Sequence, residues 1–447
     1  MPNTQLPPSG QFAFLKTLAF ARGHIEVLRD CARELGRAFT LPTNFGPLVL
    51  TGDPEGIKEI FTADPDTFKP FGTVPLEPIV GPNSMLLLSG ARHKRERKLL
   101  MPPFHGERMR AYGQIMQSTA ITAVSRLRPG EALVMQDLTQ TITFDIILRT
   151  VFGVQDSARI AYCHELNNEL MGALHPTFMF LPFLRRQAVP RWKRFTDAQK
   201  KMRELLQDQI DACRKGEDNQ EHILALMLTA RDEAGEPMTN AELQDELITM
   251  IAAGHETTAI GLAWAFFWLH KHPAILRRLL DEVDSLGEDP SPDALAKLPY
   301  LGAVCDEALR RSPVLPIVPR RLVKPFRLFD WEIPPGAGVA AAVPAVHFDP
   351  DLYPEPEAFR PERFLERKYS PFEYLPFGGG YRRCLGAAFA GYEMRIVLGT
   401  ILGRHCFTLD STEIPGLVRR NVTIGPKGGI PMHYVGERNA RHVVAAS

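Results

Sequence analysis

The sequence predicts a mainly α-helical fold with small β-sheets, and three observations support this prediction. The pattern is mostly helical from about residue 92 to residue 309, with short polar connections. After Pro313 it changes to strands and loops punctuated by Pro and Gly. Short strand-like runs stand near both ends of the chain, at 39–41, 48–51, 422–424 and 431–435. Because no repeat or Gly/Ser linker separates these parts, we expect a single domain over residues 1–447.

The composition is that of an ordinary globular chain able to bury a large core. Hydrophobic residues make up 45% and charged residues 23% of the 447 residues. Lys+Arg and Asp+Glu each number 52, so the balanced charge predicts no nucleic-acid partner. The six cysteines show no paired spacing of a disulfide framework, which favours a reducing compartment.

The apolar patch near the N-terminus, Phe12 to Phe20, is short and is interrupted by Lys16. A membrane span needs about 20 apolar residues. The patch also lacks the basic start and the small-residue cleavage site of a secretory signal. We therefore expect a cytoplasmic protein without a membrane anchor.

One helix is predicted to be long enough to cross a domain. Thr239-Asn-Ala-Glu242 is a capping-box sequence, and Pro273 ends the helix after about His272. At 1.5 Å rise per residue this helix is about 50 Å long. Apolar residues dominate both sides of Glu256 and Thr257, so these groups are either bonded internally or used in chemistry. The alternative to a functional pair is a kink with an internally bonded polar cluster.

Two further helices carry polar pairs that allow two interpretations. Glu307 and Arg310 stand at i and i+3 on one helix face, where an exposed ion pair is common and contributes little. His93 and Arg97 stand four residues apart, on what could be a solvated basic face. The neighbouring cations fit that second interpretation: Lys94, Arg95 and Lys98.

The run Phe377-Gly-Gly-Gly-Tyr-Arg-Arg-Cys384-Leu-Gly386 surrounds one thiol with glycines, an aromatic and two arginines. A helix-like run follows, and a thiol at a helix N-terminus beside cations favours the thiolate, which binds metal. Gly380 and Gly386 allow turns denied to other residues and let a flat cofactor lie close. A lone cysteine is usually a small buried apolar residue, but none of the other five has such a frame.

The spacing Phe-x-x-Gly-x-Arg-x-Cys-x-Gly resembles the haem-binding loop of the cytochrome P450 family. The resemblance covers essentially the whole chain. It implies the cytochrome P450 fold, with haem b between the long central helix and the cysteine-loop helix. It also implies that Cys384 is the axial ligand of the haem iron, with Phe377 and Gly378 as further cofactor-binding residues.

Ala253-Gly-His-Glu256-Thr257 resembles the oxygen-activation motif in the central helix of that family. The resemblance implies that Thr257 hydrogen-bonds bound dioxygen and that Glu256 feeds protons to it. It also implies four partners for the anionic haem propionates. These are His93, Arg97, Arg320 and Arg382, with Arg321 competing for the role of Arg320.

Glu307-Ala-Leu-Arg310 resembles the Glu-x-x-Arg motif of the family. There the pair joins an arginine from a downstream Pro-x-Arg-Phe segment, and Pro361-Glu-Arg363-Phe364 matches that segment. The implied role is structural, because the three side chains would hold the chain that leads into the cysteine loop.

The implied activity is that of a haem-thiolate monooxygenase of the soluble bacterial type, monomeric and using O2. The substrate would be a hydrophobic small molecule such as a fatty acid, terpenoid or polyketide, hydroxylated or epoxidised in a pocket that draws on the apolar segments 178–184 and 314–318. Electrons would come from a separate ferredoxin or flavodoxin with its reductase. The basic residues that could steer such a partner are Lys94, Arg95, Lys98 and Arg383.

Two alternatives from other functional classes remain. One is a peroxide-driven peroxygenase or a P450-like isomerase, and the other is a non-catalytic haem sensor or carrier. Neither needs the proton relay that Glu256 and Thr257 would form.

Overall fold

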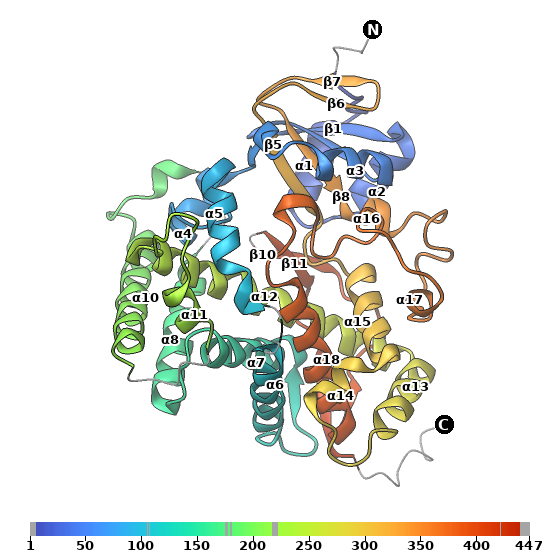
Figure 1. The fold of residues 1–447 in the computed structure, drawn as a ribbon. Helices are drawn as coiled ribbons and strands as arrows, with labels where there is room; N and C mark the ends of the chain where they lie inside the picture. The colour runs from blue at the N-terminus through green and yellow to red at the C-terminus, as the bar shows by residue number, and fades with distance from the viewer. Residues whose placement is uncertain are drawn as a thin grey trace. The chain divides into compact units, whose positions relative to one another are not determined.

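The computed structural model describes residues 6–104, 106, 108–174, 178, 181–216, 222–420 and 422–438. Helices dominate this part of the chain, together with four small sheets (Figure 1). The predicted mainly α fold with small β-sheets is therefore confirmed. Among the described helices, none is long and apolar enough to cross a membrane.

The chain folds into two compact units. The first contains Met1–Lys69, Met116–Ile142 and Thr257–Ser447, and the second contains Pro70–Ile115 and Thr143–Glu256. Three helices have residues in both units: α6 (Arg108–Val124), α7 (Met135–Thr150) and α12 (Asn240–Lys271). The expectation of one domain over residues 1–447 stays a prediction.

The first unit holds the strands and the C-terminal helices. Its elements before α6 are α1 (Ala13–Ala21), α2 (Glu26–Leu35), β1 (Ala38–Thr43), β2 (Gly46–Thr51), α3 (Pro54–Thr62), η1 (Pro65–Thr67) and β3 (Phe68–Pro70). Those after α12 are α13 (Pro273–Asp284), α14 (Pro292–Lys297), α15 (Pro299–Arg311), β5 (Ile317–Leu322), β6 (Phe326–Leu328), β7 (Trp331–Ile333), β8 (Gly338–Ala342), α16 (Val343–His347), α17 (Arg363–Glu366), η4 (Gly380–Arg382), α18 (Ala387–Arg404), β9 (His405–Leu409), β10 (Leu417–Arg420), β11 (Thr423–Pro426) and β12 (Pro431–Glu437). Between α6 and α7 lies β4 (Ala132–Val134).

The largest sheet has five strands in the order β1-β2-β8-β5-β3. β1 and β2 form an antiparallel hairpin, while β2 pairs with β8 in parallel, with Val49 opposite Val339. β5 then runs antiparallel to β8, with Arg320 opposite Val339. The other sheets have the orders β4-β12-β9, β10-β11 and β6-β7.

A hydrophobic core packs against the five-stranded sheet and extends to the segment before the cysteine. Fully buried residues of the sheet and of α3, such as Val49, Val339 and Phe61, belong to this core. Leu375 is also buried in it, and Tyr381 packs against it. The cysteine segment is therefore anchored in the same core as the sheet.

The second unit is helical. Its own elements are α4 (Thr73–Val80), α5 (Gly90–Leu100), η2 (Pro102–Phe104), α8 (Ser157–Ala173), η3 (Pro182–Leu184), α10 (Pro190–Lys215) and α11 (Ile223–Thr229). α12 begins as predicted, because the Thr239 hydroxyl accepts from the Glu242 N–H at 3.2 Å while the Glu242 carboxylate accepts from the Thr239 N–H at 2.8 Å. The helix ends at Lys271, before Pro273 begins α13.

Candidate active site

Cys384 lies in a tight loop between η4 and α18. Its backbone N–H donates to the carbonyl of Phe377 at 2.9 Å, which closes the loop. Gly378 and Gly380 have φ angles of +62° and +67°, in the left-handed region that favours glycine. The predicted turn role of Gly380 is thus confirmed, and the loop presents Cys384 as an exposed side chain.

The glycines of this loop also permit a close approach, but by a protein side chain. A Cβ on Gly379 would lie 2.1 Å from the ring of Phe61, and one on Gly380 would lie 2.3 Å from the Phe61 carbonyl oxygen. The space beside Gly380 that the sequence assigns to a flat cofactor is therefore occupied by α3. Beside Gly386 a Cβ would meet no atom within 4 Å.

Cys384 differs from the other five cysteines in its exposure. Four of them are buried and the fifth, Cys406, is partly buried. Burial raises the pKa of Cys163 to about 11 and that of Cys305 to about 12, so these thiols stay protonated near neutral pH. Cys384 is therefore the most accessible of the six thiols, and its role as a ligand stays a prediction.

Arg320 on β5 reaches the same loop. Its Nη2 donates to the carbonyl of Gly379 at 2.8 Å, and its guanidinium stacks over the ring of Phe61 at 4.7 Å. The side chain is fully buried, and burial lowers its pKa to about 10. Nε and Nη1 of Arg320 have no hydrogen-bond partner. A buried cation with two unsatisfied donors fits an anionic partner, such as a haem propionate, beside the cysteine loop.

Arg321 points elsewhere. Its guanidinium donates to the carbonyls of Gly336, at 3.0 Å, and of Phe45, at 2.5 Å. Of the two adjacent arginines, Arg320 is therefore the one that contacts the cysteine loop. Arg382 also lies at the loop, half-buried, and its Nε donates to the Tyr381 hydroxyl at 3.3 Å.

The centre of α12 carries the two residues of the resemblance to the oxygen-activation motif. Glu256 is buried and Thr257 is half-buried, while Ala253, one turn earlier, is exposed. A Cβ on Gly254 would lie 2.6 Å from Cδ1 of Ile147 on α7, so this glycine is needed for helix packing. Burial lowers the pKa of His255, which keeps that side chain neutral.

Threonines of α7 donate to carbonyls of α12 on either side of the Glu256–Thr257 pair. Thr143 Oγ1 donates to the His255 carbonyl at 2.9 Å, and Thr139 Oγ1 donates to the Ala259 carbonyl at 3.0 Å. These bonds come from side chains of α7 and not from an internally bonded polar cluster of α12. They do not involve the side chains of Glu256 or Thr257, and the functional role of that pair stays a prediction.

Glu393 on α18 is a buried acid that the sequence argument missed. It bonds to Thr258, the neighbour of Thr257, and burial raises its pKa well above the ordinary value. Its Oε1 has no hydrogen-bond partner. A single acid within the apolar run 387–402 is the sequence signal that could have identified it.

His93 and Arg97 stand on α5, with His93 buried and Arg97 half-buried. These two residues and Glu256 belong to the second unit, while Cys384, Arg320, Arg382 and Thr257 belong to the first. The i, i+4 spacing on one helix face is as predicted. Their proposed role toward a propionate stays a prediction.

Arg95, next to these residues, is engaged with carboxylates rather than exposed as a free cation. It pairs with Asp232 at 2.6 Å, with Glu96 at 2.5 Å and with Glu242 at 3.4 Å. Lys98 pairs with Glu233 at 3.0 Å on the surface. The expected basic cluster is therefore weaker than the sequence suggests, since three carboxylates neutralise Arg95.

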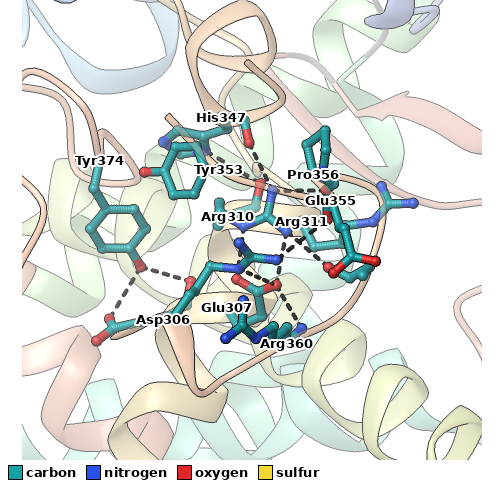
Figure 2. Close-up of polar contacts among 12 residues, drawn as sticks. Asp306, Glu307, Arg310, Arg311, His347, Tyr353, Glu355, Pro356, Arg360 and Tyr374 are labelled. Carbon is teal, nitrogen blue, oxygen red and sulfur yellow. Dashed lines mark hydrogen bonds and ion pairs between the residues drawn. The ribbon is translucent and has the colours of Figure 1, made fainter. Parts of the chain in front are cut away.

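Glu307 and Arg310 form a buried ion pair, not the exposed pair of the alternative interpretation (Figure 2). Arg310 donates to both carboxylate oxygens of Glu307, from Nε at 2.7 Å and from Nη2 at 2.8 Å, and both side chains are fully buried. Arg363 pairs with the same carboxylate at 3.2 Å, as expected for the third member. The Arg360 N–H donates to it at 2.8 Å.

The arginines of this network also hold the chain after α16. Arg310 donates to the carbonyls of His347 at 2.7 Å, Pro356 at 3.0 Å and Ala358 at 3.1 Å (Figure 2). Arg363 donates to the Pro354 carbonyl at 3.0 Å. His347 is the last residue of α16, and the other three carbonyls lie in irregular chain, so the guanidinium groups supply hydrogen bonds that regular structure would otherwise provide.

His347 connects the network to the cysteine loop. Its Nδ1 faces the Arg310 carbonyl at 3.3 Å, and its Nε2 accepts from the Leu375 N–H at 2.9 Å. The Leu375 carbonyl then accepts from Gly378, at the start of the loop that carries Cys384. An unbroken series of hydrogen bonds therefore leads from Arg310 to the cysteine loop.

His347 makes stability depend on pH in a defined direction. Burial, with the nearby charge of Arg310, lowers the pKa of His347 to about 3, whereas an unfolded histidine has a pKa of about 6.5. Its contribution is therefore present above pH 6.5 and is lost as pH falls below 6.5. At pH 5 we expect a loss of about 2 kcal/mol from this group.

The test compares His347→Gln, which keeps an acceptor for Leu375, with the wild type in urea at pH 7 and pH 5. The stability difference between the two proteins should shift by about 2 kcal/mol in favour of the variant at pH 5. Comparing two proteins at each pH is necessary because burial raises the pKa of Glu246 to about 8 and acts in the opposite direction. A pH-independent difference for His347→Gln would contradict the assignment.

A mainly helical fold with small sheets and an exposed cysteine in a glycine-rich loop is typical of haem proteins of one class. The chain matches that class, described as "Cytochrome P450", over residues 4–430. It is 34% identical to cytochrome P450 138 of Mycobacterium tuberculosis, over 96% of each chain, and 34% identical to cytochrome P450 135A1 of the same organism, over 97% of this chain and 96% of that one. The chain therefore belongs to the cytochrome P450 family, whose cofactor is haem b.

A solved structure confirms the fold. The cyanobacterial CYP120A1, in a structure described as retinoic acid bound, superposes with a TM-score of 0.84. The match covers 98% of this chain and 100% of that one, at 24% sequence identity. At that level of identity the likeness establishes the cytochrome P450 fold.

Proposed function

We propose that this P450 monooxygenase hydroxylates or epoxidises a hydrophobic small molecule such as a fatty acid, terpenoid or polyketide. The observation that carries the proposal is an apolar segment beside the cysteine loop. Val318 Cγ1 lies 3.3 Å from the position of a Cβ on Gly378, and Leu315, in the same segment, keeps 40% of its surface exposed. An apolar segment that contacts the loop through Val318 and exposes Leu315 suits an apolar ligand. The segment 178–184 is also expected to contribute to the pocket. Two of its residues, Met179 and Phe180, lie outside the described residues.

Several residues of the first unit would bind the cofactor, each at a different part of it. When bound, haem b supplies the iron at which O2 is reduced and one oxygen atom is passed to the substrate. Cys384 would be the axial ligand, and its thiolate would donate electron density toward that iron. Arg320 and Arg382 would bind propionates, with Phe377 and Gly378 shaping the loop. The unsatisfied donors of Arg320 support this assignment.

Two residues of α12 would bind dioxygen and supply protons to it. We assign Thr257 as the hydroxyl that hydrogen-bonds dioxygen and Glu256 as the acid that resupplies the proton. His93 and Arg97 of α5 would bind a propionate. Electrons would come from a separate ferredoxin or flavodoxin with its reductase. Since Arg95 and Lys98 are paired with carboxylates, any electrostatic steering of that partner would fall to Lys94 and Arg383.

The proposed function has a direct test. The purified holoenzyme is screened by the haem spin-state change against fatty acids, terpenes and macrolides, and hits are incubated with NAD(P)H, a ferredoxin or flavodoxin and its reductase. Oxygenated product under these conditions supports the proposal. Turnover with hydrogen peroxide alone would instead support a peroxygenase, and spin-state changes without oxidised product in either assay would support a sensor.

Thr257→Ala should keep haem and substrate binding but lower the product formed per NAD(P)H several-fold. The hydroxyl is needed only after dioxygen binds, so its loss diverts reduced oxygen to hydrogen peroxide. Product and peroxide are measured against NAD(P)H consumed. Thr257→Ser is the matched control, because it keeps the hydroxyl and should stay close to the wild type. If Thr257→Ala and the wild type form equal amounts of product per NAD(P)H, the Thr257 hydroxyl has no role in the reaction.

A further inference from the structure

The first unit contains a hollow with a volume of about 290 Å³. No residue of the cysteine loop belongs to its lining. Its base is formed by buried residues of α12 and β11, including Trp264, Trp268 and Ile424. At its mouth stand Ile414, which keeps 51% of its surface exposed, and the exposed Gly416. A buried aromatic base below an exposed rim is the form of a small-molecule site.

Two arginines line this hollow, Arg29 from α2 and Arg311 from the end of α15. Arg311 lies between Trp268 and Phe348, at 4.9 Å from each ring, and Arg29 lies 4.2 Å from the ring of Phe348. Their side chains are only 13% and 15% exposed. The two cations are thus held rigidly against aromatic rings, at a wall that is mostly shielded from water.

The two arginines share a single carboxylate. Glu357 pairs with Arg311 at 2.8 Å and, through its other oxygen, with Arg29. That carboxylate is 55% exposed, whereas the arginines are largely buried. Burial lowers the pKa of Arg311 to about 10, a sign that its charge is poorly compensated. Among the described lining residues the acidic one is Glu26, which is exposed at the surface.

Donors remain on both arginines. A guanidinium offers five N–H groups. Arg311 uses Nε on the Glu357 carbonyl, at 2.9 Å, and Nη2 on the Glu357 carboxylate, while Arg29 uses Nη2 on the same carboxylate. Among the described residues, Nε of Arg29 is buried and has no hydrogen-bond partner. An anion entering the hollow would therefore meet two cations with spare donors.

We propose that this hollow is a second ligand site, for a small apolar carboxylate. Its carboxylate meets Arg29 and Arg311, and its hydrocarbon body lies along Trp268, Leu417 and Ile424. Charge-assisted bonds to guanidinium groups select the carboxylate, and the apolar lining selects the body. Because the lining belongs to α12, α15 and the β10–β11 hairpin, the bound ligand contacts all three elements.

The test uses the holoenzyme with 4-phenylimidazole coordinated at the haem, so that the substrate site is blocked. Decanoate is titrated by calorimetry, and 1-decanol serves as the neutral probe of the same length. We expect one decanoate site, and binding of decanol weaker by roughly tenfold or more, because a charge-assisted bond is lost. Absence of decanoate binding up to its solubility limit would overturn the proposal.

Variants locate the site. Arg29→Gln should weaken decanoate binding roughly tenfold or more. Arg33→Gln, an exposed residue one turn further along α2, is the matched control and should bind as the wild type does. Gly416→Leu fills the mouth at a position where a Cβ meets no atom within 4 Å, so it should fold normally and exclude decanoate. Undiminished binding in Gly416→Leu, or an equal loss in Arg29→Gln and Arg33→Gln, would show that decanoate binds elsewhere.

Discussion

Cys384→Ser should abolish the thiolate-specific absorption band of the reduced, CO-treated holoenzyme. Serine oxygen is a harder and less polarisable ligand than thiolate sulfur, so retained haem would still lose the thiolate spectrum. Monooxygenase turnover should fall below detection in the same variant. Of the six cysteines, the exposed one is replaced, and its loop is closed by backbone bonds that serine can keep.

The matched control is Cys406→Ser, which replaces the partly buried cysteine of β9 in the same unit. Its spectrum should equal that of the wild type. A wild-type spectrum in Cys384→Ser would place the iron ligand elsewhere, whatever the effect on turnover. Loss of the band in both variants would indicate a general dependence on thiols rather than ligation by Cys384.

Glu307→Ala should yield protein with little or no bound haem and a markedly lower melting temperature. The change leaves Arg310 and Arg363 buried beside each other without the carboxylate they share. A buried charge that loses its partner costs roughly 3–5 kcal/mol, a large share of the ~5–15 kcal/mol that stabilises a typical protein. The cysteine loop should be destabilised together with this network, because His347 connects Arg310 to Leu375.

Haem content per protein and thermal unfolding are measured together. Asp197→Ala removes the acid of an exposed i, i+4 pair with Lys193 and should change neither quantity. Full haem content and a normal melting temperature in Glu307→Ala would mean that the network does not position the loop. Arg310→Lys is informative as well, because lysine cannot reproduce the two parallel bonds to Glu307.

The features that could be predicted from the sequence are those set by local chemistry. The limits of α12 follow from the capping box at Thr239 and from Pro273, and the glycine turn before Cys384 follows from its residue types. The pairing of Glu307 with Arg310 follows from their spacing, but their complete burial does not. An i, i+3 pair looks the same in sequence whether it faces water or the core.

The features that were missed depend on segments far apart in the chain. Nothing near Gly379 indicates that Phe61 occupies the space beside it. Arg95 reads as part of a basic helix face until Asp232, more than a hundred residues away, is placed next to it. The choice of Arg320 over Arg321 likewise required the strand register, which decides which of two adjacent side chains faces the loop.

The contact between Phe61 and the glycines before Cys384 has a consequence for how the protein is made. Phe61 and Gly379 are 318 positions apart in the chain, so the ribosome must add most of the sequence after α3 before the two can meet. At typical synthesis rates this takes roughly 15–60 s. Through that interval α3 lacks one of its packing partners, and the thiol loop lacks its support. Cofactor capture at this loop is therefore a late event that follows synthesis of nearly the entire chain.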